Sequence, residues 1–235
     1  MSWAPEPTAF VRDLEAKSAA LRSLAGALAD DPWRQVRDDA RLIVVLGMGS
    51  SRFSGLPVAA RLRARGLDAV AAYASAPFAH SGGHGTLAIG VSASGATPET
   101  VGALTRHAQA GSTTVAITNV AASPLERAAA MHLPMLAGAE TGGVACRSFQ
   151  HTLALVLALV EPRRAVAAPA ATADASEDLL EHRDRWLPDA RGARLGDGCR
   201  VPVASRRAAQ FGRTGRPDAA RGPACARRRV RLAPR

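Results

Sequence analysis

Two short segments of the sequence combine serine, threonine and glycine in a way that suits the binding of a phosphate group. The first reads Gly47-Met-Gly-Ser-Ser51, and the second reads Ser92-Ala-Ser-Gly-Ala-Thr97. Hydroxyl groups and the accessible amides of glycine-rich turns donate hydrogen bonds to an anion, most effectively where a helix begins. Serine and glycine are also common in ordinary surface turns. For either segment taken alone, an ordinary turn is therefore an equally open interpretation.

Neither segment has the pattern of a nucleotide-binding loop. Both lack the lysine of a P-loop, and Gly47 and Gly49 are not followed by the third glycine and the later acidic residue of a dinucleotide site. We therefore predict no cofactor. We also predict no metal, because His80 and His84 lie in a glycine-rich stretch that predicts a loop, not the helix that would bring them together.

The elements that would position the two segments alternate between strand and helix. Apolar runs of strand length predict strands at Arg41–Leu46, Asp68–Tyr73, Leu87–Val91, Thr113–Thr118 and His132–Met135. Helices are expected between and after them, at Phe53–Arg65, at Pro98–Ala110, from Ser123, and at about Val144–Val160. This order predicts a three-layer α/β/α sandwich with a five-stranded parallel sheet, whose ligands bind beyond the carboxyl ends of the strands.

By composition, the chain divides into an N-terminal helical segment, residues 1–40, an α/β domain, residues 41–160, and a third segment, residues 161–189. Apolar side chains at helical spacing support the assignment of residues 1–40 as helical. The third segment is expected to combine an alanine- and proline-rich linker, 163–173, with one more amphipathic helix at about 176–186.

Residues 190–235 form a tail that carries the positive charge. They hold 13 Arg and two acidic residues, whereas the rest of the chain holds 17 basic and 18 acidic residues and is nearly neutral. Because the tail has no apolar periodicity, one interpretation is a disordered cationic arm that contacts nucleic acid. We favour the other, an aberrant out-of-frame translation of a GC-rich gene, since Arg, Ala, Gly and Pro all have GC-rich codons.

The sequence predicts a cytoplasmic protein. It has no apolar run of about 18 residues and no pattern of a secretory signal, so we expect no membrane partner. Cys146, Cys199 and Cys225 are odd in number and widely spaced, which predicts free thiols.

Four segments, in order and spacing, resemble those of the sugar isomerase (SIS) domain family. They are residues 42–51, 92–100, 116–125 and 137–145. The sequence is most similar to the first SIS domain of the isomerase half of glutamine:fructose-6-phosphate aminotransferase, and to related ketose/aldose isomerases and aminosugar deaminases. The resemblance covers about half of the chain and implies the same α/β/α fold.

The resemblance implies that five hydroxyl-bearing residues hold or adjoin the phosphate of a sugar: Ser50, Ser51, Ser92, Ser94 and Thr97. The family's second loop usually reads Ser-Gln-Ser-Gly-Glu-Thr, where this chain has Ala93 and Ala96. A further hydroxyl that reaches the sugar is replaced by Ala145. These losses leave the phosphate site in place but leave the identity of the sugar open.

Glu140 is the one carboxylate within these segments and is a weak candidate for the base of an ene-diol isomerisation. We favour the alternative that it orders its own loop through backbone amides. In the two-domain relatives, the catalytic Glu, His and Lys come from the second SIS domain and the segment after it. This sequence has no counterpart of those parts, so catalytic residues are unassigned and a truncated relative is one interpretation.

The resemblance implies a phosphosugar-binding protein of aminosugar or hexose phosphate metabolism, acting as an aldose–ketose isomerase or as a deaminase- or aminotransferase-type isomerase. The alternative is a sugar-phosphate-sensing regulatory module whose basic tail contacts nucleic acid or an acidic partner. Residues 1–40 lack the helix-turn-helix pattern of such regulators, so nucleic acid is not the expected partner. We expect a homo-oligomer, because the relatives complete their pockets with a neighbouring SIS domain.

Overall fold

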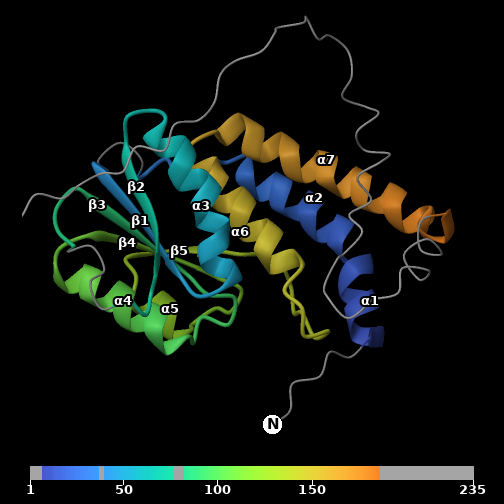
Figure 1. Ribbon diagram of the computed structural model, residues 1–235, viewed down its shortest axis with the longest axis horizontal. Helices are drawn as coiled ribbons and strands as arrows, with labels where there is room; N and C mark the ends of the chain where they lie inside the picture. The colour runs from blue at the N-terminus through green and yellow to red at the C-terminus, as the bar shows by residue number, and fades with distance from the viewer. Residues whose placement is uncertain (1–6, 37–39, 77–81, 186–235) are drawn as a thin grey trace, which may run out of the picture. The chain divides into compact units, whose positions relative to one another are not determined.

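A parallel sheet forms the centre of the protein. The computed structural model describes residues 7–36, 40–76 and 82–185, so His80, Cys199, Cys225 and the tail 190–235 lie outside the described residues. The strands run in the order β2-β1-β3-β4-β5 and are all parallel (Figure 1). Their bounds are β1 Leu42–Gly47, β2 Asp68–Tyr73, β3 Thr86–Val91, β4 Thr113–Thr118 and β5 Met131–Pro134.

Helices cover both faces of the sheet (Figure 1). Their bounds are α1 Pro7–Glu15, α2 Lys17–Leu28, α3 Ser50–Arg63, α4 Pro98–Gln109, α5 Pro124–Arg127, α6 Arg147–Ala158 and α7 Pro162–Glu181. Side chains of β1 alternate between the two layers, since Ile43 and Val45 pack with α3 and α6, whereas Val44 and Leu46 pack with α4 and α5. The predicted three-layer α/β/α fold with a five-stranded parallel sheet is confirmed.

The strands lie close to where the apolar runs predict them. Those at Asp68–Tyr73 and Thr113–Thr118 have the predicted bounds. The helix expected from Ser123 is α5, and Ser123 caps it, because its hydroxyl accepts a hydrogen bond from the amide of Glu126 at 3.3 Å. The helix expected at Phe53 begins three residues earlier, at Ser50, so the serines of the first segment are part of its first turn.

The segment 163–173, expected to be a linker, is helical and belongs to α7. Pro162 occupies the start of this helix, where proline is favoured. Pro169 lies inside it, although an internal proline costs about 3 kcal/mol. Alanine, the best helix former, fills much of the surrounding sequence, and the buried Ala165 and Ala173 give α7 a packed face. Packing and propensity together outweigh the proline.

The N-terminal helices pack against the α/β domain. Leu24, Leu28 and Trp33 belong to the same buried cluster as the sheet residues and Leu155 of α6. The indole Nε1 of Trp33 donates a hydrogen bond to the carbonyl oxygen of Leu155 at 2.6 Å. On this side of the sheet, α2 therefore shares one buried cluster with the strands, α3, α6 and α7.

Candidate phosphate-binding site

The two hydroxyl-rich loops lie next to each other in the structure. β1 and β3 are neighbouring parallel strands, with Gly47 paired to Val91 at their carboxyl ends. The strand order reverses between them, because β2 lies on the far side of β1 and β4 on the far side of β3. A parallel sheet opens a crevice where the order reverses, and ligands bind there.

The first loop presents Ser50 and Ser51 at the start of α3. Gly49 has a φ of +50° and precedes the first helical residue. The Oγ of Ser54 donates to the carbonyl oxygen of Ser51 at 2.7 Å and is buried, so this hydroxyl serves the helix itself. Ser50 is exposed and Ser51 is half-buried, so both residues are accessible from the crevice.

The second loop holds its three hydroxyls together. Ser92 Oγ lies 2.8 Å from Thr97 Oγ1 and 3.4 Å from Ser94 Oγ. Ser94 Oγ also accepts a hydrogen bond from the amide of Ala96 at 3.3 Å. Gly95 is the residue that permits this tight loop, because its φ is +63° and a Cβ there would lie 2.4 Å from the Cβ of Ser123.

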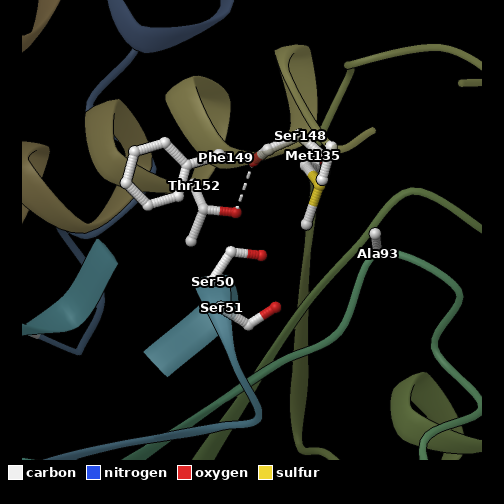
Figure 2. Close-up of a pocket in the computed structure, with 8 residues that line it drawn as sticks. Ser50, Ser51, Ala93, Met135, Ser148, Phe149 and Thr152 are labelled. Carbon is white, nitrogen blue, oxygen red and sulfur yellow. Dashed lines mark hydrogen bonds between the residues drawn. The ribbon is translucent and has the colours of Figure 1, made fainter. Parts of the chain in front are cut away.

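A small cavity of about 40 Å³ lies between the first loop and α6. Eight described residues line it: Ser50, Ser51, Ala93, Met135, Ala145, Ser148, Phe149 and Thr152. Figure 2 shows Ser50 and Ser51 pointing into the space below Thr152, with Ala93 of the second loop across from Ser51. None of these lining side chains is charged, so hydroxyls supply the polar surface.

The structure thus brings the predicted residues into two groups. Ser50 and Ser51 line the cavity, whereas Ser92, Ser94 and Thr97 form their own hydrogen-bonded cluster beside it, with Ala93 as the point where that loop reaches the lining. Ser94 is an exposed residue, whereas Ser92 is buried. An anion would have to bind across both groups to use all five residues.

α6 contributes hydroxyls that no sequence pattern indicated. Ser148 and Thr152 lie one turn apart on this helix and both line the cavity, with Thr152 Oγ1 donating to the Ser148 carbonyl oxygen at 2.8 Å (Figure 2). Their spacing of four residues places them on one face of a helix. That spacing was the available signal, but nothing in the sequence identifies the face of α6 that turns toward the start of α3.

Glu140 binds the start of α6. Its carboxylate accepts hydrogen bonds from the amides of Cys146 at 2.8 Å, Arg147 at 2.6 Å and Ser148 at 3.1 Å. Burial raises the pKa of Glu140, but the hydrogen bonds from Ser148, Arg147 and Cys146 outweigh it and hold this pKa below its ordinary value. A carboxylate whose oxygens are engaged in this way is a poor base, and the geometry is that of loop ordering.

Histidines offer no alternative centre in the described ranges. His151 is fully buried on α6, where its Nδ1 lies 2.9 Å from the carbonyl oxygen of Met135. Burial is the main cause that lowers the pKa of His151, which favours the neutral ring. No three His, Cys, Asp or Glu side chains gather as a metal-binding group in the part of the chain that the structure describes.

No helix among the described residues combines the length and apolar character needed to span a bilayer. The cytoplasmic location stays a prediction from the sequence.

Comparisons with known proteins agree with this architecture. A family model described as SIS domain matches residues 38–162, just over half of the 235 residues. The C-terminal domain of glucosamine-fructose-6-phosphate aminotransferase from Francisella tularensis has a TM-score of 0.61 at 17% identity, covering 77% of this chain and 56% of that chain. Tagatose-6-phosphate ketose/aldose isomerase from Escherichia coli has a TM-score of 0.60 at 20% identity, covering 78% and 57%.

At these identities the structural likeness concerns the fold. The chain spans a little more than half the length of each of the two structures. No curated protein sequence matches it significantly.

Proposed function

Because the chain belongs to the SIS domain family, we propose that it binds a phosphorylated sugar, a hexose or aminohexose phosphate, at the loops after β1 and β3. One observation carries the proposal. Two hydroxyl-rich loops, one of them opening a helix, meet beside an uncharged cavity at the point where the strand order reverses. Sugar phosphates also appear in the names of both structural relatives.

The phosphate group is proposed to lie against Ser50, Ser51, Ser92, Ser94 and Thr97. The hydroxyl hydrogens of Ser92, Ser94 and Thr97 can rotate from their mutual bonds toward an anion without moving the backbone. No carboxylate lines the cavity, so nothing among its described lining residues repels a phosphate. The exposed Ser50 and Ser94 mark the open side through which the ligand enters.

The sugar must extend beyond this cavity. Ligand pockets usually measure about 300 Å³ or more, whereas the cavity measures about 40 Å³. We therefore propose a homo-oligomer in which a second copy of the chain covers the open side of the site. Phe53 and Leu56 of α3 are exposed, 49% and 40% accessible, and follow Ser50 and Ser51 within two turns of the same helix, so they offer an apolar surface for that copy.

For the reaction, we propose aldose–ketose isomerisation or the related conversion of an aminosugar phosphate. A base would remove the proton from the carbon beside the carbonyl, and the resulting ene-diol or enolamine would take a proton at the neighbouring carbon. Glu140 is not placed to be that base, because its oxygens bind the first turn of α6. We propose that the base is supplied by the copy of the chain that covers the site.

The proposal is tested by thermal shift of the full chain with fructose 6-phosphate and glucosamine 6-phosphate, beside the unphosphorylated sugars and inorganic phosphate. We expect stabilisation by the sugar phosphates above that given by phosphate alone, and no effect of the unphosphorylated sugars. Product formation, followed in the same samples, separates an enzyme from a binding protein. Equal shifts with and without the phosphate group would refute the proposed site.

Serine-to-alanine variants test where on the protein the sugar phosphate binds. Ser51→Ala and Ser94→Ala should each weaken sugar-phosphate binding about tenfold, since a hydrogen bond to a charged group contributes about 1.5–3 kcal/mol. Ser23→Ala on the exposed surface of α2 is the matched control and should bind as the unaltered protein does. Sedimentation velocity of the same samples tests the oligomer, and a monomer that binds with full affinity would contradict the proposed second copy.

A further inference from the structure

Asp13 of α1 is a buried carboxylate bound to the loop that precedes α6. Only 4% of the residue is accessible. Its Oδ2 accepts hydrogen bonds from the amides of Thr141 at 2.9 Å and Gly142 at 2.7 Å, and its Oδ1 accepts from Nη2 of Arg147 at 2.8 Å. These bonds, with that from Gly142 the strongest cause, hold the pKa of Asp13 below its ordinary value. The carboxylate is therefore ionised while it holds this loop.

The backbone of α1 lies directly on the same loop. A Cβ added to Gly142 would meet the Cα of Phe10 at 2.4 Å and its backbone nitrogen at 2.6 Å. Only glycine permits so close an approach between a helix backbone and a loop. The contact between α1 and the loop thus has a fixed geometry, with Asp13 supplying the polar part and Phe10 the steric part.

Arg147 extends the contact to α6. This side chain is 6% accessible, and its Nη2 also donates to the carbonyl oxygen of Ala139 at 2.5 Å. Asp13 is the carboxylate paired with it, so loss of Asp13 would leave a buried cation without its counter-charge. Arg147 is the first residue of α6, one position before Ser148 of the cavity.

Glu140 completes the connection from the other side of the loop. It immediately precedes Thr141 and Gly142, whose amides Asp13 binds, and its carboxylate accepts hydrogen bonds from the amides of Cys146, Arg147 and Ser148. A shift of the loop would move Glu140, and with it the helix start that carries Ser148. Ala145, the residue before this turn, also lines the cavity.

We propose that Asp13 is a positioning residue for the candidate site: it holds residues 138–148 so that Ser148 and Thr152 face Ser50 and Ser51 across the cavity. The inference rests on the proposed function. Asp13 itself does not line the cavity, so its effect on a ligand passes through Arg147, Glu140 and the first turn of α6. A helix 134 residues away in sequence thereby sets the geometry of the site.

The test compares Asp13→Asn with Asp174→Asn in the full chain. Asp174 is the matched control, because it is also an ion-paired carboxylate, 2.9 Å from Arg22, but is exposed on α7. Hydrogen exchange is measured at the amides of residues 141–148 and at those of β3, together with the dissociation constant for fructose 6-phosphate. The amides of Cys146 to Ser148 are the critical readout, since Asp13 does not touch them.

We expect Asp13→Asn to speed exchange at residues 141–148 by about tenfold relative to β3 and to weaken binding by a similar factor. Asp174→Asn should change neither. Exchange that speeds up equally in β3 would show a role in global stability alone and would overturn the proposal, as would local loosening with unchanged affinity.

The experiment also distinguishes a failure of sugar-phosphate binding from a failure of the variant to fold. If the unaltered protein binds no sugar phosphate, the proposed function fails, and exchange at Cys146 to Ser148 still decides whether Asp13 orders the helix start. If Asp13→Asn does not fold, Asp13→Glu keeps the charge beside Arg147 and displaces the carboxylate. We expect the same local pattern in that variant, and wild-type exchange and affinity would overturn the inference.

Discussion

Replacing Gly95 with alanine should destabilise the protein and disturb the second loop of the site. A Cβ at this position would lie 2.2 Å from the Oγ of Ser123, 2.4 Å from its Cβ and 2.7 Å from Thr118 Oγ1. The hydroxyl of Ser123 can rotate away, but its Cβ is fixed by the buried N-cap of α5. The backbone must move, and the φ of +63° adds strain for any residue with a side chain.

The expected loss of stability has two contributions, the strained backbone conformation and the steric overlap with Ser123. The left-handed backbone costs an alanine about 1 kcal/mol, and forced overpacking costs about 1–3 kcal/mol more. The expected loss is about 2–4 kcal/mol, measured as the shift in the midpoint of urea unfolding at constant slope. The thermal midpoint should fall by about 5–15 °C.

Gly102 of α4 provides the matched control for this prediction. A Cβ there meets Nη1 of Arg106 at 3.5 Å, an ordinary contact, and the residue lies inside a helix. Gly102→Ala should therefore stabilise the protein, by about 0.5–1 kcal/mol. Equal stability of Gly95→Ala and the unaltered protein would refute the packing of the loop against Ser123.

Two further predictions concern the core beneath the site. His151 has a lowered pKa because it is buried, so the unfolded chain takes up a proton below about pH 6.5 that the folded chain resists. This contribution of His151 to the free energy of unfolding should be fully present above that pH and should decrease as the pH is lowered. In His151→Gln, the fall in thermal midpoint between about pH 7.5 and pH 5.5 should therefore be smaller than in the unaltered protein. An equal fall in both proteins would exclude His151 as the cause of the pH dependence. Trp33→Phe removes the 2.6 Å hydrogen bond to the carbonyl oxygen of Leu155 in a fully buried position and should cost about 1–3 kcal/mol in urea unfolding. An unaltered unfolding midpoint would contradict that bond.

The strands and the two loops could be predicted from the sequence because the patterns that indicate them are local. The apolar runs at Asp68–Tyr73 and Thr113–Thr118 are bounded by turn residues, and the expected bounds match β2 and β4. The first half of α7, where the sequence predicts a linker at 163–173, differs from the prediction for the opposite reason. Pro169 is a strong local signal for a break, but buried packing of Ala165 and Ala173 decides the outcome.

Some residues of the candidate site could be predicted from the sequence, and others could not. Ser50, Ser51, Ser92, Ser94 and Thr97 could be selected by residue type and by position after a predicted strand. Ser148 and Thr152 could not, because their approach to Ser50 and Ser51 depends on how α6 rotates when it packs. The bond between Asp13 and Arg147 joins residues 134 positions apart, and no sequence pattern links them.

We propose that the loops after β1 and β3 bind the phosphate group of a sugar. Backbone amide NMR of the full chain, titrated with fructose 6-phosphate and separately with fructose, tests it directly. The predicted result is a saturable set of shifts at residues 49–51 and 92–97 with the phosphorylated sugar alone. Shifts confined to the open cleft near Ser75 and Arg106, or no shifts with either ligand, would contradict it.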